Sequence, residues 1–190
     1  MGEIVLADTS PIIYLAQIGR ISWLRDIFGY VAITSAVRRE LLPARDVRGK
    51  PAIEEAVRDR ILREIEDKWS VPAFSALDEG EDSTIRVAVN LSRRGHHCHV
   101  LIDDKQARRA LQSLASQNLD FAGTAAVVVR AKRLGLVNSV ASELEKLRAL
   151  GFRLGDDVAR SILESVGEGS EVWPPPAKPE IPPESHRRRR

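Results

Sequence analysis

Short apolar runs that end at acidic residues recur along this chain and alternate with stretches of helical spacing. Residues 4–7 are apolar and lead into Asp8, and residues 100–102 are apolar and lead into Asp103 and Asp104. Such runs favour buried strands, and the 3.6-residue periodicity that follows each of them favours a helix. Strands that alternate with helices are typical of a parallel sheet covered by helices on both faces. The sequence therefore predicts a three-layer α/β/α fold with a central parallel sheet.

The remaining elements continue this alternation. Further strands are predicted at residues 31–33 and 119–122, and an extended segment at 69–74. Glycines and capping residues mark the ends of the predicted helices. The helices are predicted over residues 12–19, 21–29, 35–42, 51–68, 78–91, 107–114, 125–134, 139–150 and 155–166.

The length and charge of the chain restrict its organisation. A chain of 190 residues suits one domain of about 150 residues with appendages. We expect this domain over residues 1–166, followed by a flexible tail over 167–190 that is rich in proline and ends in four arginines. The net charge is +2, and without those arginines the balance is 25 basic against 27 acidic residues, or −2. Binding to nucleic acid must then depend on local basic patches or on the tail.

The cellular compartment is also predicted from the sequence. The single cysteine, Cys98, excludes an internal disulfide, so the chain does not need an oxidising compartment. Glu3 and Asp8 interrupt the N-terminal apolar run, which argues against a signal peptide. No stretch approaches the roughly 18 apolar residues of a membrane-spanning helix. We expect a soluble cytoplasmic protein without membrane contact.

The acidic residues are the candidates for function. Ligands of parallel α/β sheets bind outside the carboxyl ends of the strands, where Asp8, Asp103 and Asp104 are predicted to lie. Glu40 and Glu81 belong to helices that can pack beside this edge. Clustered carboxylates repel one another, which calls for a cation. Oxygen ligands favour Mg²⁺ or Mn²⁺, which retain positions for a phosphate and an attacking water. This pattern predicts cleavage of phosphodiesters.

Four motifs in a fixed order give the chain a family resemblance. They are Asp8-Thr9-Ser10-Pro11, Gly80-Glu81, Leu101-Ile102-Asp103-Asp104 and Gly123-Thr124. In this order, over roughly residues 3 to 165, they resemble PIN-like domains, the relatives of VapC-like toxin ribonucleases. The chain differs from many of those toxins, which carry an aspartate in another local pattern where it has Gly80-Glu81.

The resemblance implies a metal-dependent endoribonuclease with a three-layer PIN-like fold. The implied catalytic residues and ligands of Mg²⁺ or Mn²⁺ are Asp8, Glu40, Glu81 and Asp103. Ser10, Asp104 and Thr124 are implied to surround them. The implied partners are an RNA substrate, a small antitoxin protein that holds a toxin inactive, and a second copy of the chain in a homodimer.

Each acidic residue also has a purely structural interpretation. Asp8 and either Asp103 or Asp104 are suitable helix caps, Glu81 suits the positive end of a helix dipole, and Glu40 suits an exposed helix surface. The run from His96 to His99 offers zinc-binding side chains, but adjacent residues rarely close a tetrahedral site. Six arginines are interpreted as solvated surface charge: Arg93, Arg94, Arg108, Arg109, Arg130 and Arg133.

Two other functions remain open. A phosphotransfer domain also places aspartates at strand ends, but the phosphatases need Asp-x-Asp after the first strand, and Ser10 occupies the position of the second aspartate. A catalytically inactive PIN-like module that binds RNA or protein is the other alternative, against which the retained carboxylates argue.

Overall fold

The computed structural model describes residues 3–42, 49–66, 76–114 and 118–169. The predicted extended segment at 69–74 and almost all of the predicted tail lie outside these residues. The strands are β1 (Glu3–Ala7), β2 (Val31–Thr34), β3 (Leu62–Ile65), β4 (His97–Leu101) and β5 (Leu119–Ala122). The helices are α1 (Thr9–Gln17), α2 (Trp23–Phe28), α3 (Ser35–Leu41), α4 (Lys50–Arg58), α5 (Glu79–Arg93), α6 (Lys105–Ser113), α7 (Thr124–Arg133), α8 (Val140–Ala149) and α9 (Asp156–Ser165).

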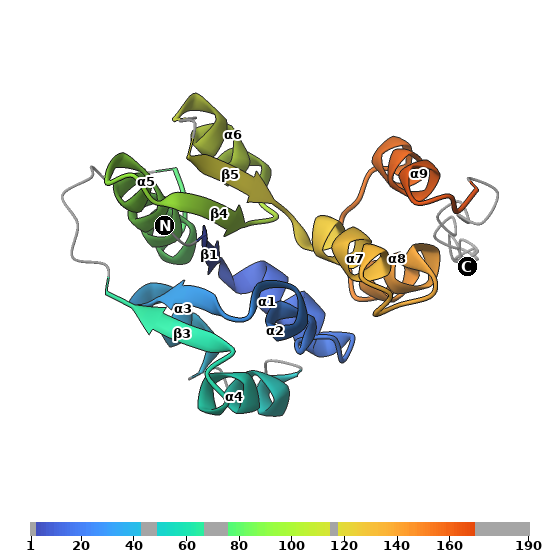
Figure 1. Ribbon diagram of the computed structural model, residues 1–190, viewed down its shortest axis with the longest axis horizontal. Helices are drawn as coiled ribbons and strands as arrows, with labels where there is room; N and C mark the ends of the chain where they lie inside the picture. The colour runs from blue at the N-terminus through green and yellow to red at the C-terminus, as the bar shows by residue number, and fades with distance from the viewer. Residues whose placement is uncertain (1–2, 43–48, 67–75, 115–117, 170–190) are drawn as a thin grey trace, which may run out of the picture.

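The strands form one parallel sheet in the order β3-β2-β1-β4-β5 (Figure 1). The central strand β1 pairs with β2 on one side and with β4 on the other, with Val5 beside His99. Because all strands run the same way, their carboxyl ends meet at one edge. The predicted three-layer α/β/α fold with a parallel sheet is confirmed.

A separate hydrophobic core covers each face of the sheet. Successive strand residues point to opposite faces, so Val5 and Ala7 enter one core and Leu6 enters the other. The first core contains residues of α1, α2, α3, α4, α7, α8 and α9, and the second contains residues of α5 and α6. Figure 1 shows α7, α8 and α9 gathered at one end of the molecule. None of the helices in the described ranges is long and apolar enough to span a membrane.

The single helix predicted over residues 51–68 is wrong. Helix α4 ends at Arg58, and the chain then turns through Arg60, whose φ of +59° lies in the left-handed region. Strand β3 follows and pairs in parallel with β2 from Leu62 to Ile65. The apolar residues of this segment keep helical spacing across the break, and no glycine marks the turn, so periodicity alone did not separate the two elements.

Two helix starts bear on the later argument. The predicted cap Ser35 is wrong by one residue, because the Thr34 hydroxyl accepts the Val37 amide of α3 at 3.2 Å. Asp104 is the cap of α6 and accepts the amides of Gln106 and Ala107 at 2.6 and 3.0 Å. Oδ1 of Asp104 thus stabilises the start of its own helix.

The end of α9 is fastened to the start of α8 by one carboxylate. Gly167, with φ +72°, turns the chain so that Glu168 reaches back. The Glu168 carboxylate accepts the amides of Val140 and Ala141 at 2.7 and 2.9 Å and the Ser139 hydroxyl at 3.0 Å. This contact holds α9 in place beside α8.

Candidate active site

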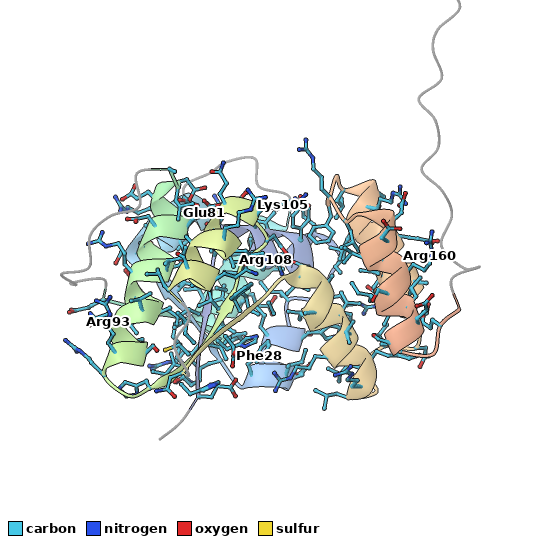
Figure 2. All side chains as sticks on the ribbon, turned by 90° about the horizontal axis from the view of Figure 1, so that it is seen from above. Phe28, Glu81, Arg93, Lys105, Arg108 and Arg160 are labelled. Carbon is cyan, nitrogen blue, oxygen red and sulfur yellow. The ribbon has the colours of Figure 1, made fainter. Side chains whose placement is uncertain are left out.

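A cleft of about 860 Å³ opens at the carboxyl edge of the sheet. Its acidic wall contains Glu81, Asp103 and Asp104, and Ser10 lies at its base. The opposite wall is formed by α9 and by the chain that leads into it, residues 151–155. Figure 2 shows Glu81, Lys105 and Arg108 close together on one side of the molecule. The cleft therefore lies where ligands of parallel α/β sheets bind.

Asp8 follows β1 directly and is almost completely buried, with 3% of its surface exposed. It occupies the cap position of α1, yet its side chain makes no capping hydrogen bond, and Oδ1 has no hydrogen-bond partner among the described residues. Burial raises the pKa of Asp8 to about 7, and the charges of Asp78 and Glu81 raise it as well. The backbone amides of Thr9 and Ser10 act in the opposite direction and lower this pKa. A buried carboxylate oxygen without a partner is costly, so capping of α1 alone does not account for Asp8 at this position.

Glu81 lies at the start of α5 in a reciprocal cap with Asp78. The Glu81 amide donates to Asp78 Oδ1 at 2.8 Å, and the Asp78 amide donates to Glu81 Oε2 at 3.4 Å. Burial raises the pKa of Glu81 to about 7, and the charges of Asp78, Asp104 and Glu40 contribute to the rise. Carboxylates from α3, α5 and the start of α6 are thus near enough to one another to interact.

Glu40 projects from α3 toward the starts of α1 and α5. The Thr9 hydroxyl donates to Glu40 Oε2 at 2.5 Å. A Cβ atom added at Gly80 would come within 2.7 Å of Glu40 Oε1, closer than real contacts allow. Glycine at position 80 therefore leaves the space into which the Glu40 carboxylate fits.

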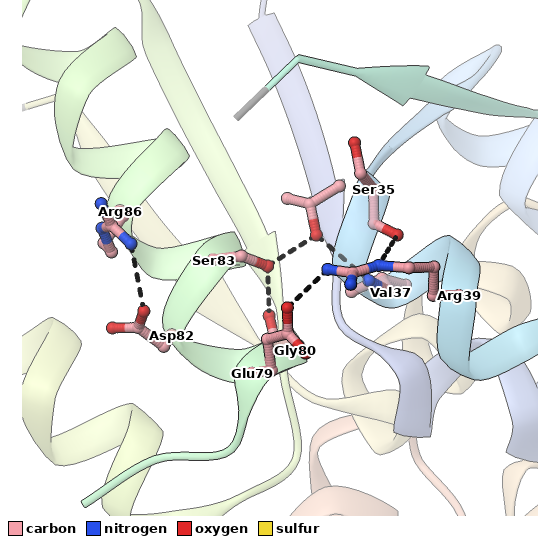
Figure 3. Close-up of polar contacts among 9 residues, drawn as sticks. Ser35, Val37, Arg39, Glu79, Gly80, Asp82, Ser83 and Arg86 are labelled. Atoms are coloured by element: carbon pink, nitrogen blue, oxygen red, sulfur yellow. Dashed lines mark hydrogen bonds and ion pairs between the residues drawn. The ribbon is translucent and has the colours of Figure 1, made fainter. Parts of the chain in front are cut away.

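Polar contacts join α3 to α5 and fix this geometry (Figure 3). The buried hydroxyls of Thr34 and Ser83 lie 2.6 Å apart, and the Ser83 hydroxyl donates to the Gly80 carbonyl at 3.0 Å. At the surface, Arg39 forms an ion pair with Glu79 at 2.5 Å. These contacts hold the helices that carry Glu40 and Glu81 against each other.

Asp103 follows β4 and is held by the start of α7. Its Oδ1 accepts the Thr124 amide at 2.8 Å, and its Oδ2 accepts the Thr124 hydroxyl at 2.6 Å. Burial raises the pKa of Asp103, while both Thr124 groups and the Arg108 charge lower it. A Cβ atom at Gly123 would meet Asp103 Oδ1 at 2.6 Å, so glycine is needed for this close approach.

Basic residues line the same cleft. Lys105 and Arg108 come from α6, and Arg153 comes from the opposite wall. Arg108 Nε donates to the Ile102 carbonyl at 3.1 Å, which fixes the guanidinium beside Asp103. The cleft thus combines carboxylates that attract cations with cations that attract phosphates.

The structure places all seven predicted site residues at or beside this edge. Glu81, Asp103, Asp104 and Ser10 line the cleft, Asp8 and Glu40 interact with Glu81 from behind it, and Thr124 contacts Asp103. Two contributors were missed in the sequence. Asp78 was predicted only to begin a helix, although its spacing to Glu81 is that of a capping box. Arg108 was interpreted as solvated charge, and no local signal distinguishes it from other helix-surface arginines.

These residues suit a divalent cation in their chemistry. Several carboxylates meet in a partly buried place, and one buried oxygen, Asp8 Oδ1, has no protein partner in the described part of the chain. Across residues 3–42, 49–66, 76–114 and 118–169, however, no three acidic, histidine or cysteine side chains are arranged around one ion position. The hydroxyl of Thr9 donates a hydrogen bond to an oxygen of Glu40, and the hydroxyl of Thr124 donates one to an oxygen of Asp103. Binding of an ion would require these side chains to turn.

The parallel sheet places carboxylates from separate parts of the sequence at one edge. The chain is therefore an α/β protein with an acidic site at the carboxyl ends of its strands. Within that class, a family model described as a PIN domain matches residues 4–168. Because this match covers most of the chain, the protein belongs to the PIN-domain family, whose members are generally nucleases and typically use divalent metals. Comparison with curated proteins found no match.

Proposed function

We propose that this protein is a metal-dependent endoribonuclease of the PIN type that hydrolyses RNA phosphodiesters. The observation that carries the proposal is Asp8, a buried carboxylate at the sheet edge whose Oδ1 has no partner among the described residues and whose pKa is raised to about 7. Strongly perturbed acids in clefts are candidates for functional residues. Membership of the PIN-domain family supports the nuclease assignment.

Four carboxylates would hold the ion in this proposal: Asp8, Glu40, Glu81 and Asp103. Bound Mg²⁺ or Mn²⁺ would supply positive charge that favours ionisation of an attacking water and offsets the charge of the phosphate. Because Asp8 and Glu81 have pKa values of about 7 without the ion, its binding would release protons near neutral pH.

The other residues of the cleft orient the site and the RNA. Thr124 holds the Asp103 carboxylate with two hydrogen bonds, which fixes the direction of its oxygens. Ser10 at the base of the cleft is the proposed hydroxyl contact. Lys105, Arg108 and Arg153 line the cleft, and we propose that they pair with phosphates of the RNA.

Cleavage of a mixed RNA pool tests the proposal. The purified protein is incubated with Mn²⁺, with Mg²⁺ and with chelator, beside the Asp8→Asn variant. We expect cutting that depends on the metal and is lost in the variant, whose fold is checked by circular dichroism. Absence of cutting by folded, metal-loaded protein would instead favour the non-catalytic RNA- or protein-binding alternative.

The proposal extends to protein partners through the resemblance to toxin ribonucleases. We propose that the protein acts in the cytoplasm as the toxin of a toxin–antitoxin pair, with a small antitoxin as inhibitor and a homodimer as the active form. Growth arrest on induction, relieved by a co-expressed antitoxin candidate, tests the first part. Sedimentation of the purified protein tests the dimer, and a monomeric mass at working concentrations would contradict it.

A further inference from the structure

A second groove lies beside the candidate active site, on the sheet face covered by α2 and α7. It encloses about 440 Å³, and its floor is formed by His99 and Leu101 of β4. Phe28, at the end of α2, forms one wall, and Arg130 and Arg133 of α7 form the other. We call it the α2–α7 groove. None of its lining residues belongs to the predicted metal-binding set.

The groove combines two aromatic rings with two exposed guanidinium groups. The rings of Phe28 and His99 lie 6.2 Å apart with an angle of 32° between their planes. The Arg130 guanidinium lies over the Phe28 ring, 5.0 Å from its centre. Arg130 and Arg133 are exposed, and neither has an acidic partner within the described part of the chain. Burial lowers the pKa of the His99 ring, and the charges of Glu3 and Asp120 oppose this shift.

The groove adjoins the active-site cleft. Ala126 and Val129 of α7 line both the groove and the cleft. The groove and the cleft are therefore separated by one face of this helix. Helix α7 begins at Thr124, which contacts Asp103, and ends at Arg133 beside the groove. A strand of RNA that leaves the cleft along α7 therefore reaches the groove.

This chemistry suits a nucleotide. A base has a flat face that stacks on aromatic rings, and its phosphate attracts guanidinium groups. An acidic protein segment would use the arginines but would gain little from the Phe28 and His99 rings. A membrane surface would need a broad exposed apolar face, whereas this depression is narrow and lies against the sheet.

We infer that the α2–α7 groove binds an unpaired nucleotide of a single-stranded RNA whose neighbouring segment occupies the active-site cleft. The base stacks on the Phe28 and His99 rings, and Arg130, which turns away from the Phe28 ring, pairs with the phosphate together with Arg133. The inference rests on the proposed function, because it takes RNA as the ligand of the adjoining cleft. It makes these four residues determinants of RNA affinity rather than of the cleavage step.

Binding without cleavage tests the groove. A fluorescent single-stranded RNA of about 12 nucleotides is titrated with the full chain in chelator, and anisotropy is measured. We expect Phe28→Leu and Arg130→Gln each to weaken binding about tenfold, the effect of losing one stacked base or one paired phosphate. The matched control is Arg93→Gln, an exposed arginine at the end of α5 (Figure 2), and it should change the dissociation constant less than about twofold.

The salt dependence separates a specific phosphate contact from general attraction. For single strands, each phosphate contact contributes about 0.7 to the slope of log affinity against log salt concentration. Arg130→Gln should reduce the slope by about this amount, and Phe28→Leu should leave it unchanged. If polyglutamate displaced RNA equally well from the parent and from Phe28→Leu, the groove would be a surface that binds acidic chains. That result would overturn the inference.

Two results keep this inference separate from the proposed function. RNA that binds in a Phe28-dependent manner but is not cut with Mn²⁺ would overturn the nuclease proposal and leave the groove assignment standing. If the Phe28→Leu and Arg130→Gln variants cut RNA with the parental KM, the groove assignment alone would be overturned. Because Arg130 is exposed, its substitution tests the groove even if Phe28→Leu fails to fold.

Discussion

Replacement of Asp8 by asparagine should make the metal-free protein more stable while it abolishes cleavage. Burial raises the pKa of Asp8 from 3.8 to about 7 in the folded chain. Between these two values the unfolded chain has an ionised Asp8, while the folded chain retains the proton. The folded state therefore binds more protons, and its stability falls as the pH rises toward 7. Asparagine carries no charge and avoids this loss.

The size of the effect follows from the shift. One pKa unit corresponds to about 1.4 kcal/mol, so Asp8 costs about 3 kcal/mol of stability between pH 5 and pH 7 and no more above that range. The buried asparagine amide itself costs about 1–3 kcal/mol, since Asp8 Oδ1 has no partner within the described residues. We expect the variant to match the parent near pH 5 and to exceed it by about 1–3 kcal/mol at pH 8.

Urea unfolding in chelator at pH 5 and pH 8 measures this difference. The control is Asp157→Asn, because the Asp157 side chain is 98% exposed and pairs with Arg160 at the surface. Its stability relative to the parent should change little with pH. If the gap between Asp8→Asn and the parent were the same at both pH values, the burial argument for Asp8 would be refuted.

Three further predictions concern the same site. Gly80→Ala should keep the melting temperature within about 2 °C. It should lower the cleavage rate and the Mn²⁺ affinity about tenfold, because the added methyl group displaces the Glu40 carboxylate. Cleavage at the parental rate would argue against Glu40 as a ligand. Mg²⁺ at about ten times its dissociation constant should stabilise the parent by about 1.4 kcal/mol, or about 3–6 °C by calorimetry, and an equal shift in Asp8→Asn would place the ion elsewhere. Thr124→Val should raise the pKa of Asp103 further, so that the acid limb of the pH–rate profile moves to higher pH; an unchanged limb would contradict this role of Thr124.

The parts of the fold set by local pattern were predictable. The apolar runs before Asp8 and Asp103 identified β1 and β4, and the capping signal at Asp78 identified α5. Parallel pairing then requires both aspartates to lie at one edge. The joining of β3 to β2 was not predictable, because the turn at Arg60 uses a left-handed conformation that arginine rarely adopts.

The predicted site lacked the contacts that depend on distant residues. The approach of α3 to α5 rests on Thr34 and Ser83, which are 49 positions apart and carry no signal of their own in the sequence. The close fit of Gly80 against Glu40 likewise appears only when the helices are packed. Sequence patterns supplied the candidate carboxylates, while tertiary packing determines how their oxygens are directed.

The Glu168 contact has a consequence for how the chain can be cut or extended. Helix α9 forms a wall of the cleft, and the Glu168 carboxylate that follows it joins the end of α9 to the start of α8. Proteolysis just before residue 168 would remove this contact and leave every acidic residue of the candidate site in the chain, while Leu163 would still pack α9 against the core. A C-terminal fusion that begins after residue 169 spares the contact. The end of α9 can therefore be loosened by truncation without the loss of any proposed metal ligand.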